Sequence, residues 1–318
     1  MVPHYHELFE RNFGIFTPGE QERIRASGIL IVGCGGIGGT VAVMLARSGM
    51  EKFILVDFDV YGISNMNRQI GCFSDTLGRN KAEVIGEEIC KINPEAQVEV
   101  FPELLSHEKI AELIERVDVV FPAADDLAFS IVVFRDAQRL GKPSLMVVPS
   151  GTWANVTILM PDGPPVEEIE GVPKLGSYEE LKTMLSTRKY RYGTYFYVPV
   201  ADWRIDYYRS FIEETKPPAH IAPLVWLCSS LGAFEVIKLI SGKWKPVSSP
   251  RYWNITRNAI RINRINGLSL QTLLVWQRKV MWLLFQTPLA PLLEQAQNLW
   301  WKLFCAWYSY RERKRSGG

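Results

Sequence analysis

Apolar and polar residues alternate along residues 29–160 in two periods, one typical of strands and one typical of helices. Short apolar runs predict buried strands at Ile29–Val32, Phe53–Val56, Val98–Phe101, Asp118–Phe121, Ser144–Val148 and Thr152–Met160. Between them, apolar residues at helical spacing predict helices at Ile37–Ser48, Leu77–Ile92, His107–Arg116 and Phe129–Leu140. This alternation is typical of βαβ units and predicts an α/β, Rossmann-like, doubly wound, mostly parallel sheet.

The regular alternation ends at Pro161. Residues 161–176 hold four prolines and three glycines, which predicts a loop. A crossover segment up to Pro218 is rich in tyrosine, namely Tyr190, Tyr192, Tyr195 and Tyr197, and it is followed by a long apolar helix, Ala222–Ile240, and a hairpin, Tyr252–Thr256 with Ala259–Ile265. We therefore divide the chain into residues 1–160, residues 161–267, which complete the same domain, and a helical tail, 268–318.

The composition is that of a folded globular protein. Hydrophobic residues make up 47% of the 318 residues and charged residues 22%, which excludes a disordered or collagen-like chain. The net charge is +2, but from Leu268 onward seven Lys or Arg face two Glu, so residues 1–267 carry −3. This balance excludes a broad nucleic-acid-binding surface on the body and leaves only the tail basic.

The N-terminus and the cysteines bear on location. The N-terminal residues lack an apolar signal segment, so we expect a cytoplasmic protein. No run of about eighteen uninterrupted apolar residues exists, which predicts no ordinary membrane span. The five cysteines form no CxxC pair, which argues against a disulfide framework and a local zinc site.

A glycine-rich turn, Gly33-Cys34-Gly35-Gly36-Ile37-Gly38, lies directly between a predicted strand and a predicted helix. In this pattern Gly33 permits the tight turn, Gly35 lets a phosphate approach the backbone, and Gly38 allows close helix–strand packing. The motif fits NAD, FAD or ATP equally.

Asp57 ends the second predicted strand, 24 residues after Gly33, close to the roughly 20-residue spacing of a ribose-binding carboxylate. Asp59 follows two residues later and would lie on the same side of an extended chain. A solvated turn residue explains Asp59 equally well.

A dense polar cluster, SNMNRQ, follows in the next loop and contains Asn65, Asn67, Arg68 and Gln69. Lys81 comes thirteen residues after Arg68, early in a predicted helix. A surface arginine and an exposed helix lysine are the ordinary interpretation of either residue alone. Together they favour a triphosphate site, where they would neutralise charge on the α-phosphate and on departing pyrophosphate.

Asp125 follows the strand Asp118–Phe121, at the carboxyl edge of the sheet where open α/β folds bind ligands. A carboxylate at this place could hold Mg²⁺. It could equally cap the following helix. For Asp125 and Asp126 together, one can cap while the other coordinates.

These motifs, in this order, resemble the ThiF/MoeB/HesA family of adenylating enzymes, which are related to ubiquitin-activating enzymes. The resemblance covers Glu10 to Gly242, about three quarters of the chain. It rests on ILIVGCGGIGG, LVDFDVYGISNMNRQ, LGRNKAEV, KINPEAQVEV, AADD and the helix SSLGAFEVIKLISG.

The resemblance implies an ATP site and a role for each matching residue. Gly33, Gly35, Gly36 and Gly38 would line the phosphates, Asp57 would bind the ribose, Arg68 and Lys81 would contact the phosphates, and Asp125 would hold Mg²⁺. It also implies a homodimer, in which Arg11 of the segment ERNFGIF reaches the ATP site of the second copy. The implied reaction joins a substrate carboxylate to the α-phosphate of ATP, giving an acyl-adenylate and pyrophosphate.

The sequence also departs from the family. Many members carry two CxxC pairs that bind zinc and a nucleophilic cysteine in the crossover loop, whereas this chain has no cysteine between Cys90 and Cys228. We therefore expect neither a structural zinc nor a loop thioester, and we expect Cys228 and Cys34 to be packing residues. This favours the peptide-modifying and transfer-RNA-dehydrating branches. The tyrosine-rich segment would shape the acceptor site or form an aromatic lid.

The tail has an amphipathic stretch, Leu292–Tyr308, and a basic end, RERKR, and it contains five of the ten tryptophans. In one interpretation it lies on a membrane surface, with RERKR on anionic lipid. In the other, which we favour, its apolar face packs on the body, a second copy or a partner protein.

The sequence thus predicts an ATP-dependent adenylyltransferase that acts on a carboxylate of a peptide, a small protein or a modified nucleoside. A nicotinamide oxidoreductase would use the glycine turn and Asp57 but would leave Arg68 and Lys81 unexplained. A catalytically silent binding module of the same fold is the third possibility.

Overall fold

A single eight-stranded sheet organises the described part of the chain. The structure, a computed structural model, describes residues 4–174, 176–186, 201–213, 215–265 and 270–316; Tyr190, Tyr192, Tyr195 and Tyr197 lie outside them. The strands are β1 (Gly28–Val32), β2 (Lys52–Val56), β3 (Gln97–Phe101), β4 (Val119–Pro122), β5 (Ser144–Ser150), β6 (Trp153–Leu159), β7 (Arg251–Thr256) and β8 (Ala259–Arg264). Their order is β3-β2-β1-β4-β5-β6-β7-β8.

The sheet is parallel on one side and antiparallel on the other. Strands β3, β2, β1, β4 and β5 pair in parallel, and β5 to β8 continue as an antiparallel meander. The predicted Rossmann-like, mostly parallel sheet is therefore confirmed. The order places β1 and β4 side by side at the point where the winding reverses, which is where such sheets bind ligands.

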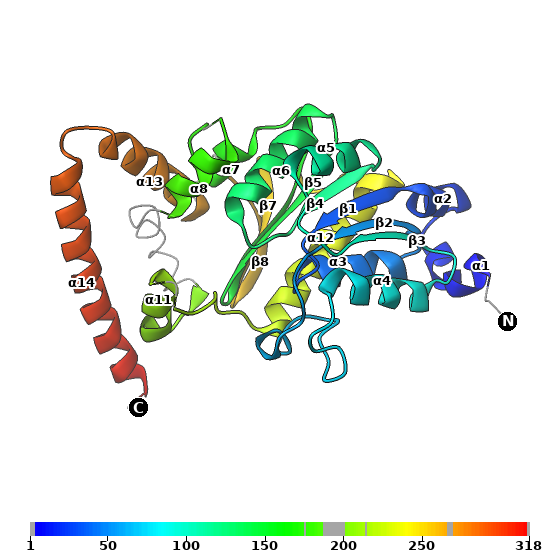
Figure 1. Cartoon of the computed structure of the whole chain (residues 1–318), viewed down its shortest axis with the longest axis horizontal. Helices are drawn as coiled ribbons and strands as arrows, with labels where there is room; N and C mark the ends of the chain where they lie inside the picture. Colours follow the sequence, from blue (N-terminus) through cyan, green and yellow to red (C-terminus); the bar gives the residue numbers. More distant parts are fainter. Residues whose placement is uncertain (1–3, 175, 187–200, 214, 266–269, 317–318) are drawn as a thin grey trace.

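Helices cover both faces of the parallel part (Figure 1). The first helices of the chain are α1 (Tyr5–Leu8), the 3-10 helix η1 (Glu10–Gly14), α2 (Pro18–Ala26), α3 (Gly38–Arg47), the 3-10 helix η2 (Ile63–Asn65), α4 (Lys81–Ile92), α5 (His107–Glu115) and α6 (Leu127–Arg139). The alternation of β1 explains the two layers, because Ile29 and Ile31 pack in the core with α3 and α4, whereas Leu30 and Val32 pack with α5 and α6.

The later helices are α7 (Val166–Glu170), α8 (Tyr178–Ser186), α11 (Ile205–Ile212), α12 (Ala222–Ser241), α13 (Leu270–Phe285) and α14 (Ala290–Ser316). Helix α12 has the length and hydropathy of a membrane span, but 56% of that window is buried inside the protein. It contacts α3, β5 and β6, and its fully buried Glu235 accepts hydrogen bonds from Val247 N and Trp253 Nε1. We therefore assign α12 to the core of the fold.

Two predicted segments differ from the structure by more than one or two residues. The helix predicted from Leu77 begins only at Lys81, because Asn80 caps it by accepting a hydrogen bond from Glu83 N. Residues 161–176 contain the helix α7 rather than a loop alone. Pro165 precedes its first residue, and Gly171 ends it in the left-handed conformation, so the residues that indicated a loop enclose one short helix.

The tail forms two helices that pack partly on the body. At the far end of the molecule from α1 and α2 (Figure 1), α14 buries Cys305 and Tyr308 against α11. From α13, Arg278 forms a buried ion pair of 3.0 Å with Glu170 of α7. The tail therefore packs on the body, but largely not through the apolar face that the sequence indicated, because only Phe304 of that face joins this cluster whereas Leu292, Leu299, Trp300, Leu303 and Trp307 are exposed. Another face stays exposed and carries Leu273, Trp276, Leu283, Leu292, Leu299, Trp300, Leu303 and Trp307.

Candidate active site at the carboxyl edge of the sheet

The glycine-rich turn forms the floor of the site. Gly33 has a φ of +102°, and a side chain there would meet the backbone of Ala123 at 2.7 Å. A Cβ on Gly38 would lie 1.8 Å from Gly33 O, so Gly38 is required for packing. At Gly35 and Gly36, in contrast, the nearest atoms are side chains of Gln69 at 3.6 Å and Val225 at 3.3 Å. These two glycines therefore leave backbone open to a ligand.

Asp57 orients this turn from the end of β2. Its carboxylate accepts hydrogen bonds from Cys34 N at 2.6 Å and from Asp59 N at 2.9 Å. Burial raises the pKa of Asp57 above its ordinary value, and the two N–H groups and Lys81 oppose that shift. Each carboxylate oxygen keeps a lone pair for a hydroxyl group, which fits the predicted ribose contact.

Lys81 lies at the start of α4 and points back to the end of β2. Its Nζ is 2.7 Å from Asp59 Oδ2, and its side chain is buried. Asn80 holds this junction, since its Nδ2 donates to Asp57 O at 2.8 Å. Asp59 is therefore the partner of Lys81, although its side chain remains 50% exposed to solvent. The role of Asn80 was missed from the sequence.

The polar loop divides into two kinds of residue. Asn65 and Asn67 maintain the local fold, because Asn65 Oδ1 accepts from Gly62 N at 3.0 Å and Asn67 Nδ2 donates to His220 O at 3.1 Å. Arg68 and Gln69 face the site instead. Gln69 is buried, and its Oε1 has no hydrogen-bond partner within the described part of the chain, so a donor group on a ligand would satisfy it.

These groups surround a cavity of about 380 Å³, which we call the edge cavity. Its walls include the predicted residues Gly33, Gly35, Gly36, Asp57, Asp59, Arg68, Gln69, Lys81 and Asp125. Gly38, Asn65 and Asn67 do not line it and act through packing or loop geometry. Open glycine backbone, two cationic side chains and the unpartnered Gln69 oxygen together fit a nucleotide that carries phosphates.

Asp125 and Asp126 have different tasks. Asp126 caps α6 by accepting from Phe129 N at 3.0 Å, and its other oxygen accepts from Tyr178 Oη at 2.8 Å. For Asp125 the structure records no hydrogen bond or ion pair with any described residue, and it lines the edge cavity. This division agrees with the alternative in which one aspartate caps the helix and the other is available to hold Mg²⁺.

The structure bears on the predicted metals only in part. Among the described residues, no group of three or more His, Cys, Asp or Glu is placed to hold a metal ion. Mg²⁺ in nucleotide sites takes one or two carboxylates and completes its shell with phosphate oxygens and water. Asp125 fits a Mg²⁺ that arrives with a nucleotide, and the expected lack of a structural zinc stays a prediction.

His220 is a site residue that the sequence did not reveal. It lines the edge cavity just before α12. Burial, and after it the charge of Arg68, lowers the pKa of His220 to about 4, so its imidazole is neutral at pH 7. Its position between Pro217-Pro218 and an apolar helix was the signal that could have drawn attention to it.

Arg11 lies outside the site of its own chain. It belongs to the 3-10 helix η1, is exposed, and lines neither this cavity nor the one described next. The resemblance assigned Arg11 to the site of a second copy, and that role stays a prediction.

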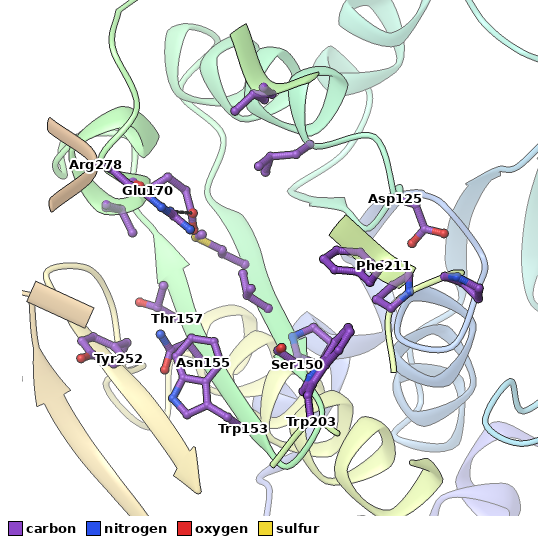
Figure 2. Close-up of a pocket in the computed structure, with 18 of the residues that line it drawn as sticks. Asp125, Ser150, Trp153, Asn155, Thr157, Glu170, Trp203, Phe211, Tyr252 and Arg278 are labelled. Atoms are coloured by element: carbon purple, nitrogen blue, oxygen red, sulfur yellow. Dashed lines mark hydrogen bonds and ion pairs between the residues drawn. The ribbon is translucent and has the colours of Figure 1, made fainter. Parts of the chain in front are cut away.

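A second, larger cavity of about 630 Å³ adjoins the first, and we call it the apolar cavity (Figure 2). Its walls include Met146, Val148, Trp153, Trp203, Tyr208 and Phe211. Both cavities share Asp125, Pro149, Pro217 and Pro218, so the two spaces meet at the carboxylate that faces the edge cavity.

Four of the five cysteines are buried, and the exposed one, Cys90, lines neither cavity. Cys34, Cys72, Cys228 and Cys305 are buried, which confirms the expected packing roles of Cys34 and Cys228. Burial raises the pKa of Cys228 to about 12, so its thiolate is scarce at neutral pH.

A family model described as "ThiF family" matches residues 9–271. This chain belongs to the ThiF family. Among curated relatives, the tRNA threonylcarbamoyladenosine dehydratase of Haemophilus influenzae is 36% identical over 37% of this chain and 48% of its own length. The sulfur carrier protein ThiS adenylyltransferase of Escherichia coli is 23% identical over 74% of this chain and 80% of its own length.

Solved structures of the ThiF fold agree with this assignment. E. coli MccB is 25% identical with a TM-score of 0.62, and the match covers 82% of this chain and 71% of MccB. PaaA, at 20% identity and a TM-score of 0.62, matches 84% of this chain and 76% of its own and shows the fold alone. The chain spans between 32% and 53% of the length of the first four curated relatives that it matches.

Proposed function

We propose that this ThiF-family protein is an ATP-dependent adenylyltransferase that activates a substrate carboxylate as an acyl-adenylate. The observation that carries the proposal is the edge cavity, where open glycine backbone, Arg68, Lys81 and Asp125 meet and where a second cavity opens. The names of the relatives support the reaction class, because they include adenylyltransferases of sulfur carrier proteins and of molybdopterin synthase.

The reaction needs positioning and charge more than proton transfer. An oxygen of the substrate carboxylate attacks the α-phosphorus of ATP, the bond to the bridging oxygen breaks, and pyrophosphate leaves. The carboxylate is ionised at neutral pH, so no protein base is required. Lys81 and Arg68 stabilise the negative charge on the phosphates, and the Gly35–Gly36 backbone holds them in place.

Mg²⁺ would be held by Asp125 and would neutralise phosphate charge when it is bound with ATP. Asp57 holds the glycine turn through Cys34 N and accepts a ribose hydroxyl. Asp59 keeps the Lys81 ammonium at the edge of the cavity before ATP binds. The neutral His220 lines the same cavity without adding a charge.

The substrate belongs to one of three classes, namely a peptide, a small-protein C-terminus or a modified nucleoside in transfer RNA. The test is ATP–pyrophosphate exchange with a panel of such carboxylates. Exchange that depends on one of them supports the proposal. Tighter equilibrium binding of NADH than of Mg·ATP would refute it and would favour the oxidoreductase.

We also propose that the active form is a homodimer in which Arg11 completes the site of the second copy. Arg11 is exposed and far enough from both cavities of its own chain that it lines neither. Two apolar side chains at the site are exposed as well, because Phe58 lines the edge cavity and Trp226 donates its Nε1–H to Arg68 O.

A mixing experiment tests this arrangement. Arg11→Ala and Lys81→Ala should each lose exchange activity alone. An equal mixture should recover about a quarter of the parent activity, because half of the dimers are mixed and each has one intact site. No recovery after verified subunit exchange would refute a site shared between copies.

For the tail, we propose that the exposed face of α13 and α14 lies on an anionic membrane surface of a protein that otherwise stays in the cytoplasm. The face carries three tryptophans that are more than half exposed, Trp276, Trp300 and Trp307. The excess of five positive charges from Leu268 onward complements anionic lipid.

A further inference from the structure

The apolar cavity lies where the acyl part of a substrate must be when its carboxylate reaches the edge cavity. Asp125, Pro149, Pro217 and Pro218 are walls of both cavities. A molecule whose carboxylate lies in the edge cavity near Asp125 can therefore place the group next to that carboxylate in the apolar cavity. The volume of this cavity, about 630 Å³, lies within the ordinary range of ligand pockets. A chain end made only of glycine residues, which have no side chains, would leave much of that volume empty.

Five aromatic side chains line this cavity, namely Trp153, Trp203, Tyr208, Phe211 and Tyr252. Figure 2 shows Trp153 on β6 and Trp203 near Ser150, with Phe211 between them and Asp125. Trp153 and Trp203 are both buried. Rings at such positions favour ligands that bury apolar surface, and they offer edges and faces to another aromatic ring.

Several polar groups of the cavity have partners within the protein. Thr157 Oγ1 donates to Arg251 O at 2.7 Å. Arg278 Nη1 donates to Glu170 Oε2 at 3.0 Å, and Figure 2 shows this pair on the side opposite Asp125. Because the charges of Arg278 and Glu170 neutralise each other, the end of the cavity remote from Asp125 does not require a charged group on the ligand.

Two opposite charges lie near the shared wall of the cavities, the ammonium of Lys216 and the carboxylate of Asp125, and of these Lys216 is the one complementary to a substrate carboxylate. Lys216 lines the cavity, is exposed, and its Nζ lies 4.9 Å from the centre of the Tyr207 ring. It precedes Pro217 and Pro218, the shared wall. An ammonium group there attracts an anionic chain end toward the junction of the two cavities.

We infer that the substrate is a peptide or protein chain whose C-terminal residue carries a large apolar side chain, with phenylalanine or leucine fitting better than glycine or aspartate. This inference rests on the proposed function, because it assumes that the carboxylate at Asp125 is the one that is adenylated. The side chain fills the apolar cavity, and the carboxylate extends into the edge cavity.

Peptide binding tests this inference without requiring chemistry. The probes are fluorescein-labelled tetrapeptides, Ala-Ala-Gly-X, in which X is Phe, Leu, Gly or Asp, titrated into the full chain with a non-hydrolysable ATP analogue and Mg²⁺. The Phe and Leu peptides should bind at least about tenfold more tightly than the Gly peptide, as expected for burying one such side chain. Equal affinities, or no binding by the Phe and Leu peptides, would overturn the inference.

Filling the cavity supplies the matched variants. Val148 lines the apolar cavity but not the edge cavity, whereas Val280 on α13 is exposed and lines neither. Val148→Trp should abolish the preference for Phe over Gly, and Val280→Trp should keep it. Leu185→Trp, on the α8 wall, repeats the test if Val148→Trp does not fold. A preference that persists in a folded filled variant would contradict the inference.

Pyrophosphate exchange with the same unlabelled peptides separates the two proposals. Exchange driven by the Gly or Asp peptide but not by Phe or Leu would uphold adenylation and overturn the apolar substrate. Selective binding of the Phe peptide without exchange, by a protein that also binds Mg·ATP, would support the apolar cavity as the peptide site and count against adenylation.

Discussion

The two ends of the sheet are built in different ways. At the parallel end, the residues of the edge cavity come mainly from the segments that directly follow β1, β2 and β4, so the strand order alone brings them together. At the antiparallel end, the apolar cavity is assembled from β5, β6, α7, α11 and α13, which are up to about 130 residues apart in sequence. Motifs identify the first kind of site, whereas only the folded chain reveals the second.

The comparison predicts that the largest loss of exchange activity follows from a change at the parallel end of the sheet. Lys81→Ala should reduce pyrophosphate exchange by about 10²- to 10³-fold, because it removes a buried cation from the phosphate site. Lys91→Ala, on the exposed side of the same helix, should leave the exchange rate unchanged. Steady-state exchange assays compare the two variants, and full activity of Lys81→Ala would remove the edge cavity from the mechanism.

At the other end, the prediction concerns stability. Arg278→Ala should lower the free energy of unfolding by about 3 kcal/mol, because it leaves the buried carboxylate of Glu170 without its partner. Lys279→Ala, its exposed neighbour, should change that free energy by less than about 0.5 kcal/mol. Urea unfolding measures both. A loss for Arg278→Ala as small as that of the control would show that α13 is not fastened to the body by this pair.

His220 lines the edge cavity, and its test is the dependence of stability on pH. Below pH 6.5 the unfolded imidazole takes up a proton, whereas the folded one stays neutral down to about pH 4. Stability should therefore be fully present above pH 6.5 and fall by about 3 kcal/mol as the pH is lowered to 4. His220→Asn should lack this part of the decline. Urea unfolding across this range would contradict the prediction if both proteins lost stability equally.

The smallest effect is expected on the outer face of the tail. Phosphatidylglycerol vesicles should co-sediment the protein, and Trp300→Ala should weaken that binding by about tenfold or less. Trp244→Ala, outside the tail, serves as the matched control and should bind like the parent. Equal binding to phosphatidylcholine and phosphatidylglycerol vesicles would rule out the proposed membrane surface. Binding that Trp300→Ala leaves unchanged would do the same, and either result would favour a protein partner for this face.

The parallel half could be predicted from the sequence because its signals are local. Gly33 and Gly38 stand where backbone contacts exclude a side chain, and Asp57 and Asp125 follow buried strands. The spacing could not show that Asp126, rather than Asp125, caps α6, because both residues suit a cap chemically. It likewise could not show that Asp59 pairs with Lys81.

The rest could not be predicted because its causes are contacts between distant segments. The helix α13 was missed as a separate element, and its place depends on Glu170 and on Val275, which packs against Gly171. His220 has no motif around it, and its role follows from where the chain enters α12. Side-chain spacing likewise could not tell which face of α14 would be covered by α11 and which would remain exposed.

Pro217 and Pro218 form part of the wall between the two cavities. Each proline ring fixes one backbone torsion, and the backbone of Lys216 before them is restricted as well. The segment Lys216–Pro218 therefore loses little conformational entropy when a ligand binds against it. Under the proposed function, the angle at which an acyl group meets the nucleotide is therefore set largely during folding. A substrate that enters this passage gives up its own freedom but does not also have to order the wall, which leaves more of its contact energy for selectivity.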